Sequence, residues 1–287
     1  MLERVRGILR RARARRRRAA ASRLLAGLPG SAPAPVRTVA AALERAMAGT
    51  FGPEERGPID RIEALREELC ASGAEVRMED FGAGSRARGP EARGPGTVVT
   101  TVGSVCASAS KPRFWCGLLF HLARSARPAR CLELGTSLGI SSAYIGTALG
   151  LNGQGLLVSI EGSPAIAALA REHHRRLGIR TVQVREGRFA EVLAPLLAET
   201  GTTDLVFIDG HHDEAATKDY FGRIRPSVPD GGIVVFDDIR WSEGMARAWR
   251  EIRASAGIAA DIDLGDMGVV VLGPDGGRRT RLDLPVS

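Results

Sequence analysis

The chain has 287 residues, of which 44% are hydrophobic and only 5% aromatic, so it can form one large or two small domains with mainly aliphatic cores. Its net charge of +7 comes from the N-terminus: residues 1–23 hold ten arginines and one glutamate, so the remainder carries −2. No run of about 18 apolar residues is present, which argues against a membrane span. Four cysteines without a Cys-x-x-Cys pair, and no apolar signal segment, indicate reduced thiols in a cytoplasmic protein.

The arginine-rich N-terminus, residues 1–35, is expected to be a tail followed by a linker. Apolar residues recur in it at helical spacing. It is therefore either a basic amphipathic helix that contacts nucleic acid or anionic lipid, or a solvated and disordered tail. Its composition also suits an organellar transit peptide, although no other feature supports one.

Residues 36–110 are predicted to form a helical cap with a long loop. The apolar spacing indicates helices over 36–48 and 53–72. Residues 80–96 are rich in glycine and arginine and are expected to form a loop, either an active-site lid or a surface linker. The small and β-branched residues 97–109 fit a strand or the start of a helix.

Residues 111–287 are expected to form the main domain. A helix over 111–124 precedes alternating strand and helix patterns, and this alternation predicts a parallel sheet with helices on both faces. A β-hairpin over 260–272 ends the pattern. The predicted strands are 130–134, 155–160, 181–185, 204–208 and 232–236, and the helices between them are 140–150, 164–177, 189–200 and 213–226.

The most informative stretch is 130–147, a short apolar strand followed by a glycine-bearing turn and a helix. Such a turn brings bare backbone close to a ligand, and the helix N-terminus offers unpaired N–H groups. The spacing Glu133-x-Gly135-x-x-x-Gly139 differs from the glycine patterns of dinucleotide-binding proteins and phosphate loops. Because an acidic residue just before the first glycine repels a pyrophosphate but attracts an ammonium group, S-adenosylmethionine fits better than NAD or ATP.

Residues 111–273 resemble class I S-adenosylmethionine-dependent methyltransferases. Within them, 132–139 (LELGTSLG) and 207–212 (FIDGHH) are similar to the small-molecule O-methyltransferases of the catechol type and their bacterial relatives. Segments 80–85 and 236–245 resemble an uncharacterised bacterial branch. The resemblance implies an α/β, doubly wound Rossmann-like fold with seven strands in the order 3-2-1-4-5-7-6, strand 7 being antiparallel.

The resemblance also implies cofactor contacts at the ends of the strands. The methionine portion would lie on Glu133 and the glycine turn, and Ser141 matches the position that contacts its carboxylate. Glu161 would accept hydrogen bonds from both ribose hydroxyls, and the loop after the third strand would bracket the adenine. For Phe189 in that loop, core packing is equally favoured. The expected cofactor-binding residues are Glu133, Gly135, Thr136, Ser137, Gly139, Ser141, Glu161, Gly187, Arg188, Phe189 and Asp209.

Three carboxylates, Asp209, Asp237 and Asp238, follow the fourth and fifth strands and would repel one another unless a positive group lies among them. In catechol-type relatives the matching positions are two Asp and one Asn that hold Mg²⁺. The resemblance therefore implies a divalent metal that lowers the pKa of a substrate hydroxyl, with Asp209 and Asp237 also taking part in catalysis. Asp238 in place of Asn leaves an extra negative charge. A second hypothesis is that Asp209 contacts cofactor or substrate, and that the other two cap the next helix without metal.

Histidine suits general base catalysis near neutral pH. His212, just past the fourth strand, is the first catalytic candidate, and His211 is the second. His173 and His174 are expected to be solvated helix residues, and no Cys/His set has the ligand spacing of a zinc site. Trp241 is expected either to form a wall of the acceptor pocket or to fix the next helix in place.

Together these patterns predict a methyltransferase that uses S-adenosylmethionine to methylate an oxygen, less favourably a nitrogen, of a small molecule. A competing hypothesis is a nucleic-acid or protein methyltransferase recruited by the arginine-rich tail. Against it, the body is slightly acidic and no Asn/Asp-Pro-Pro-Tyr/Phe motif follows the fourth strand.

Two more hypotheses come from different classes of protein. A non-catalytic cofactor-binding module would have the same fold and the same cofactor contacts. A nucleotide-dependent dehydrogenase would also use a doubly wound sheet, but Glu133 and the glycine spacing argue against it. Related enzymes are often dimers, so a homodimer is a further expectation.

Overall fold

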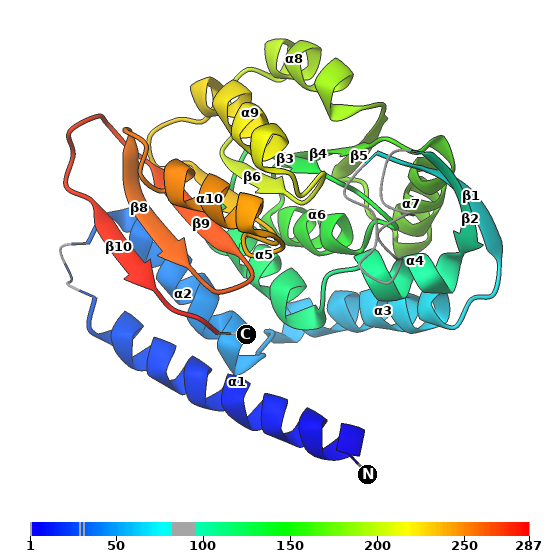
Figure 1. The fold of residues 1–287 in the computed structure, drawn as a ribbon, viewed down its shortest axis with the longest axis horizontal. Helices are drawn as coiled ribbons and strands as arrows, with labels where there is room; N and C mark the ends of the chain where they lie inside the picture. The colour runs from blue at the N-terminus through cyan, green and yellow to red at the C-terminus, as the bar shows by residue number, and fades with distance from the viewer. Residues whose placement is uncertain (1, 29, 31, 82–95, 287) are drawn as a thin grey trace.

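The computed structural model describes residues 2–28, 30, 32–81 and 96–286. Its centre is an eight-stranded sheet with helices on both faces (Figure 1). None of the helices in the described part of the chain combines the length and apolar character that a membrane crossing requires. The strands of the sheet are β3 (Arg130–Leu134), β4 (Leu156–Glu161), β5 (Val182–Glu186), β6 (Leu205–Ile208), β7 (Ile233–Phe236), β8 (Ile258–Asp263), β9 (Gly268–Leu272) and β10 (Thr280–Asp283).

The strand order is β10-β8-β9-β7-β6-β3-β4-β5, which contains the predicted seven-strand order from β5 to β8. Strands β5, β4, β3, β6 and β7 pair in parallel, whereas β9 pairs antiparallel with both β7 and β8. The predicted doubly wound α/β fold and its closing hairpin are therefore confirmed. An eighth strand, β10, pairs in parallel with β8 at the edge of the sheet, and the sequence pattern does not indicate it.

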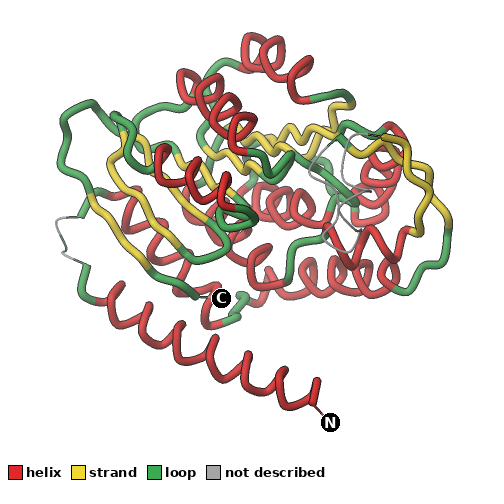
Figure 2. The backbone as a smooth tube through the Cα atoms, in the orientation of Figure 1, coloured by secondary structure: helices red, strands yellow, loops and turns green. Residues whose placement is uncertain are grey.

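Different helices cover the two faces of the sheet, because successive strand residues point to opposite sides. In β3, Cys131 belongs to the larger core on one face, and Leu132 belongs to the core on the other. Figure 2 shows the resulting layers. The helices are α2 (Ala34–Ala48), α5 (Arg113–Ala126), α6 (Ile140–Asn152) and α7 (Pro164–Leu177) on the first face, and α8 (Phe189–Thr200), α9 (Glu214–Ile224) and α10 (Glu243–Ile252) on the second.

The arginine-rich N-terminus forms the helix α1 (Leu2–Ala26) at the lower edge of the view in Figure 1, and a contact of this helix with nucleic acid or lipid stays a prediction. Ala21 and Leu25 are buried in the larger core. The guanidinium carbon of Arg18 lies 3.9 Å from the ring centroid of Phe114, and its Nε donates to the carbonyl oxygen of Val286 at 3.4 Å. The second half of α1 is thus packed against the main domain.

The remaining N-terminal elements are α3 (Pro53–Cys70), an antiparallel ribbon of β1 (Glu75–Asp80) and β2 (Gly96–Thr101), and α4 (Val102–Ala109). The ribbon lies beside α7. Most of the predicted loop over 80–96 lies outside the described residues. The segment 97–109 contains both a strand and a helix, and residues of α2 and α3 share the larger core with the sheet.

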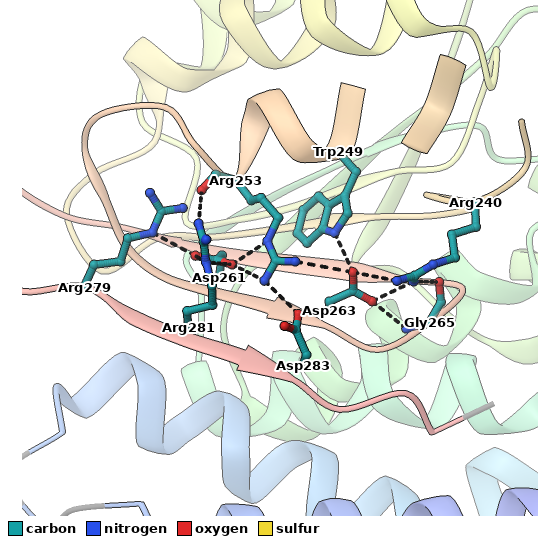
Figure 3. A network of polar contacts seen from close by, with 9 residues as sticks. All are labelled: Arg240, Trp249, Arg253, Asp261, Asp263, Gly265, Arg279, Arg281 and Asp283. Atoms are coloured by element: carbon teal, nitrogen blue, oxygen red, sulfur yellow. Dashed lines mark hydrogen bonds and ion pairs between the residues drawn. The ribbon is translucent and has the colours of Figure 1, made fainter. Parts of the chain in front are cut away.

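An ion-pair network ties the C-terminal strands to the end of α10 (Figure 3). Asp261 on β8 is fully buried and accepts hydrogen bonds from Arg253, Arg279 and Arg281 at 2.6 to 3.1 Å. Arg253 also donates to the exposed Asp283 on β10 at 2.9 Å. Because a buried carboxylate is costly unless it is paired, these arginines fix the position of β10 against β8.

The same network reaches the segment that follows β7. Asp263 accepts hydrogen bonds from Trp249 Nε1 at 2.9 Å and from both terminal nitrogens of Arg240 at 2.7 and 3.0 Å. Arg240 also donates to the carbonyl oxygen of Gly265 at 2.5 Å, in the turn of the β8–β9 hairpin. Residues 237–241 are therefore held against that hairpin.

Replacing Asp261 with Asn is expected to lower the free energy of unfolding by about 3 kcal/mol, because it removes the charge that compensates three arginines in a buried position. Asp283→Asn is the matched control: Asp283 also pairs with Arg253, but its side chain is 65% exposed. The control should cost less than about 1 kcal/mol. Urea unfolding of both variants measures the difference, and equal losses would contradict the role given to burial.

Candidate active site

The predicted site residues lie at the carboxyl ends of β3, β4, β6 and β7, where sheets of this type bind their ligands. The backbone is strained there. Of the five non-glycine residues with positive φ in the described chain, four lie at this edge: Ser137, His211, His212 and Asp238. Such conformations cost free energy that the surrounding structure must offset, and they are commonest at functional sites.

The turn after β3 requires glycine at two positions. Gly135 has a φ of 102°, and a Cβ atom there would collide with the backbone carbonyl oxygen of Asp209. Gly139 has a φ of 84°, and a Cβ atom there would lie 2.8 Å from His174 Nε2. The turn therefore packs directly on the end of β6, and only a bare backbone permits this contact.

Glu133 lies beneath this turn with no exposed surface. Its carboxylate accepts hydrogen bonds from Ser141 Oγ at 2.6 Å and Ser159 Oγ at 2.5 Å, and Ser159 Oγ lies 2.6 Å from Thr136 Oγ1. Burial raises the pKa of Glu133 to about 8. Glu133 thus positions Ser141 and the turn from behind, and its expected contact with the methionine portion stays a prediction.

Glu161 at the end of β4 occupies the position predicted for the ribose contact. Its Oε2 accepts the backbone N–H of Ser137 at 2.9 Å, and its Oε1 accepts the N–H of Ser163 at 2.9 Å. The carboxylate therefore bridges the glycine turn and the start of α7. Two amide donors fix its orientation at the edge of the sheet.

The predicted adenine loop lies at the start of α8. Gly187 has a φ of 137°, and a Cβ atom there would lie 2.5 Å from Val192 Cγ2. The ring of Phe189 lies edge-on to Tyr220 at 5.6 Å and so close to Gly210 that a Cβ atom there would be 2.5 Å away. Phe189 is partly exposed, so packing on the protein leaves one part of its surface for a ligand.

Phe81, the residue after β1, reaches the same region and is not indicated by the sequence pattern. A Cβ atom on Gly162 would lie 2.6 Å from its ring. The guanidinium carbon of Arg188 lies 5.2 Å from the ring centroid of Phe81. The N–H of Glu79 also donates to Ser163 Oγ at 3.3 Å, so the ribbon of β1 and β2 borders the end of β4.

The prediction that His173 and His174 are solvated is wrong, because they are only 4% and 3% exposed. His173 Nδ1 lies 2.9 Å from the carbonyl oxygen of Leu138, and His174 Nε2 lies 2.9 Å from Ser142 Oγ and 3.1 Å from the carbonyl oxygen of Gly139. Burial lowers the pKa of His174 to about 4. These neutral rings support the glycine turn from the α7 side.

Asp209, Asp237 and Asp238 meet around Lys111, which precedes α5. Lys111 Nζ lies 3.1 Å from Asp209 Oδ1, forms a closer ion pair with Asp237 Oδ2, and lies 3.9 Å from Asp238 Oδ2. Burial raises the pKa of Asp209 and raises that of Asp237 to about 7. Burial lowers the pKa of Lys111, but the three carboxylates outweigh this effect and raise it. The positive group expected among these carboxylates is therefore a side chain.

Sequence reasoning missed Lys111, although one signal was present. The chain contains 40 basic residues of the Lys and Arg types, yet only Lys111 and Lys218 are lysines. A lysine provides a compact point charge, whereas an arginine provides a broad planar group.

His212 and His211 point to different surroundings. His212 Nε2 lies 3.7 Å from both Asp209 Oδ1 and Asp238 Oδ2, whereas His211 Nδ1 lies 2.9 Å from the hydroxyl of Tyr220. Burial lowers the pKa of His212, so its ring is neutral near pH 7 and can accept a proton. The geometry favours His212 as the base.

Trp241 lies on the outer side of His212, with ring centroids 5.6 Å apart and planes inclined by 34°. The start of α10 is fixed independently, because Ser242 Oγ accepts the N–H of Met245 at 3.1 Å. Trp241 therefore lies beside the predicted base, and its role as a wall of an acceptor pocket stays a prediction.

The predicted metal ligands are in part brought together. Asp209, His212 and Asp237 each offer one ligand atom within 4.8 Å of the others, a donor set that suits a divalent cation. Asp238, the third predicted ligand, is not part of this group. The ammonium of Lys111 lies among the same oxygens, so the space is shared with a positive side chain. The metal stays a prediction.

Comparisons with known proteins match this region. The family profile described as a methyltransferase domain matches residues 132–239. Catechol O-methyltransferase from Niastella koreensis is 35% identical over 121 residues, which are 41% of this chain and 52% of that protein. O-methyltransferase hkm8 from Aspergillus hancockii is 30% identical over 132 residues, which are 44% of this chain and 50% of that protein. The chain thus spans about half the length of the curated relatives it matches.

Solved structures share the fold. The O-methyltransferase TomG from Streptomyces achromogenes, in complex with SAM, aligns with a TM-score of 0.51 and 24% identity over 58% of this chain and 82% of that one. The SAH-bound methyltransferase PaMTH1 from Podospora anserina aligns with a TM-score of 0.51 and 17% identity over 78% of this chain and 98% of that one.

Residues 132–239 are thus similar to methyltransferase domains, and the sheet order agrees with this similarity. The glycine turn, Glu161 and the carboxylates that follow β6 and β7 all lie within the matched residues.

Gly135→Ala is expected to destabilise the methyltransferase domain by about 2 kcal/mol or more, because the new Cβ atom meets the backbone of Asp209 and the φ of 102° is strained for alanine. Gly150→Ala is the matched control: it lies within α6, and a Cβ atom there has open space. The control should gain about 0.5–1 kcal/mol. Urea unfolding compares the two variants. An unchanged free energy of unfolding in Gly135→Ala would contradict the described turn.

The raised pKa of Glu133 predicts that the free energy of unfolding falls as the pH rises from 4.5 to about 8. Its pKa rises from 4.5 to about 8 on folding, so in this window the folded state keeps a proton that the unfolded state has released. The contribution of this group to the free energy of unfolding is complete below pH 4.5 and declines, by at most about 1.4 kcal/mol per pH unit, until pH passes 8.

Glu133→Gln should remove this part of the slope, whereas Glu172→Gln, on the exposed surface of α7, should keep it. Urea unfolding at pH 5 and pH 8.5, without added cofactor, gives the difference between variants. An unchanged slope in Glu133→Gln would show that Glu133 is ionised in the folded protein.

Proposed function

We propose that the protein is an S-adenosylmethionine-dependent O-methyltransferase that acts on a small molecule. The observation that carries the proposal is one continuous edge of the sheet. On it, Glu161 and the glycine turn adjoin a largely buried cluster of His212, Lys111 and three carboxylates, of which Asp237 is the most buried. The similarity to O-methyltransferases over about two fifths of the chain supports the same activity.

The residues of the first half of this edge fit S-adenosylmethionine. The glycine turn packs its bare backbone against the end of β6 beside Glu161, and the carboxylate of Glu161 is oriented to accept two hydroxyl donors. Phe81 and Phe189 border the position expected for an adenine ring. When bound, the cofactor supplies a methyl group activated by its positively charged sulfur.

The second half of the edge fits an acceptor hydroxyl. The neutral ring of His212 can take the hydroxyl proton on Nε2, and Asp209 and Asp238 lie 3.7 Å from that atom and stabilise the imidazolium that results. Trp241 lies beside this ring. The residues supply orientation, proton transfer and charge stabilisation, which are the main sources of rate in such a displacement.

A divalent cation at this place remains part of the sequence-based prediction. Asp209, His212 and Asp237 are the residues that would hold it, and it would lower the pKa of the acceptor hydroxyl. The cytoplasmic location, the homodimer and a nucleic-acid partner of the arginine-rich helix likewise stay predictions.

Calorimetric titration with S-adenosylmethionine tests the proposal. Tight binding is expected for the intact chain, and Glu161→Ala should weaken it about 10- to 100-fold through the loss of charge-assisted hydrogen bonds. Glu172→Ala, a surface carboxylate on the neighbouring α7, should bind as the unmodified chain does.

Because Glu161 also accepts two backbone amides, the unfolding of Glu161→Ala must be measured in parallel, and Glu161→Gln serves as a second variant that retains one acceptor oxygen. Absence of binding to the intact chain would overturn the proposed function.

A further inference from the structure

We infer that the ammonium of Lys111 is the resident cation of the acceptor site, in the position that a divalent metal would otherwise take, and that it binds a single acceptor oxygen. This inference rests on the proposed function, because it concerns how the same site holds the methyl acceptor. It differs from the metal-assisted site that the sequence predicts.

The contacts of Lys111 are those of a cation ligated by carboxylates. Its Nζ contacts Asp209 at 3.1 Å and Asp237 more closely, and the side chain of Lys111 is only 14% exposed. Asp237 is 3% exposed and Asp209 is 10% exposed. Two carboxylates so close together and so far from water need a permanent positive partner, which Lys111 provides.

The same oxygens cannot serve two cations at once. Asp209 and Asp237 supply two of the three ligand atoms that would hold a metal, and Lys111 contacts both residues. A divalent ion there would lie beside an ammonium with little water to screen the repulsion. Either the lysine side chain leaves the site or the metal does not bind.

The choice of lysine supports a specific role for the ammonium. Only two lysines occur in the chain, and the second, Lys218, forms surface ion pairs with Glu214 and Glu251. An arginine at position 111 would present a broad planar fork in place of a compact charge. The ammonium is therefore closer than a guanidinium to the shape of the metal ion that it replaces.

An ammonium limits the acceptor differently from a metal. It has three hydrogens, of which Asp209 and Asp237 accept two. Asp238, at 3.9 Å, lies beyond hydrogen-bond distance, so the third hydrogen is available to a ligand oxygen. A metal with two open positions can chelate neighbouring hydroxyls, whereas one hydrogen binds one oxygen. The acceptor class is therefore an isolated hydroxyl, such as a phenol, without need for a vicinal diol.

The chemical step balances without a metal. The acceptor hydroxyl gives its proton to His212 Nε2, and the oxygen lone pair forms the new O–CH₃ bond. The C–S bond breaks with its electron pair remaining on sulfur, which becomes a neutral thioether. Lys111 stabilises the negative charge on the acceptor oxygen and keeps its own proton throughout.

Titration with Mn²⁺ tests whether the ammonium of Lys111 or a divalent metal ion occupies the site. The intact protein, Lys111→Met and the control Lys218→Met are titrated with Mn²⁺, and the loss of the free-ion electron paramagnetic resonance signal gives binding. The intact protein and Lys218→Met should bind no Mn²⁺ at the site. Lys111→Met, which exposes the carboxylates to solvent cations, should bind Mn²⁺ at least about tenfold more tightly than any residual binding by the intact protein. Mn²⁺ should also raise the melting temperature of this variant.

Binding of Mn²⁺ to the intact protein, lost in Asp237→Asn, would overturn the inference. Absence of binding to both the intact protein and a folded Lys111→Met would also overturn it, because the carboxylates would then not form a cation site. If Lys111→Met does not fold, Lys111→Gln replaces it. The titration of the intact protein still shows whether the unmodified site binds a divalent metal.

Titration of the same samples with S-adenosylmethionine distinguishes a failure of the inference from a failure of the proposed function. If the intact protein binds S-adenosylmethionine but not Mn²⁺, and Lys111→Met binds both, the proposed function and the inference both hold. If the intact protein fails to bind S-adenosylmethionine, the proposed function fails whatever the manganese result.

Release of S-adenosylhomocysteine with simple phenols in the presence of EDTA supports the inference, and a strict need for both a catechol and added metal overturns it.

Discussion

The cost of burying negative charge governs the architecture of this protein. Four buried acidic groups of the described residues lie on the sheet or at its edge. One is Asp263, which is paired with Arg240 and Trp249, and the other three each have a different partner. Glu133 is held by two serine hydroxyls and shifts toward its protonated form, Asp237 is paired with Lys111, and Asp261 is paired with three arginines. The positions of the glycine turn, of the acceptor site and of β10 all depend on these compensations.

The C-terminal ion-pair network and the carboxylates around Lys111 are connected through the short segment that follows β7. Asp237 and Asp238 directly follow β7, and two residues later Arg240 is bound to the β8–β9 hairpin by Asp263 and Gly265. Trp249 of α10 donates to the same Asp263. The segment that presents the carboxylates to Lys111 is therefore braced from the side opposite the cofactor turn, which limits how far the carboxylates can separate.

Features with a local sequence pattern could be predicted, and features created by packing could not. The spacing of Gly135, Gly139 and Glu161 reflects one strand–turn–helix unit and the next strand, so the turn and its acidic neighbour follow from short-range rules. Lys111 contacts a residue 126 positions away, and only the docking of α5 brings them together. His173 and His174 lie on a helix whose surface the glycine turn covers, which helical periodicity alone cannot reveal. Strand β10 is short and half exposed, so it carries no strong apolar pattern.

Asp209 belongs to both halves of the edge. Its backbone carbonyl oxygen fills the space that a side chain on Gly135 would need, and its carboxylate ligates Lys111. A shift of the backbone at Asp209 would therefore move both the support of the glycine turn and the carboxylate that pairs with Lys111.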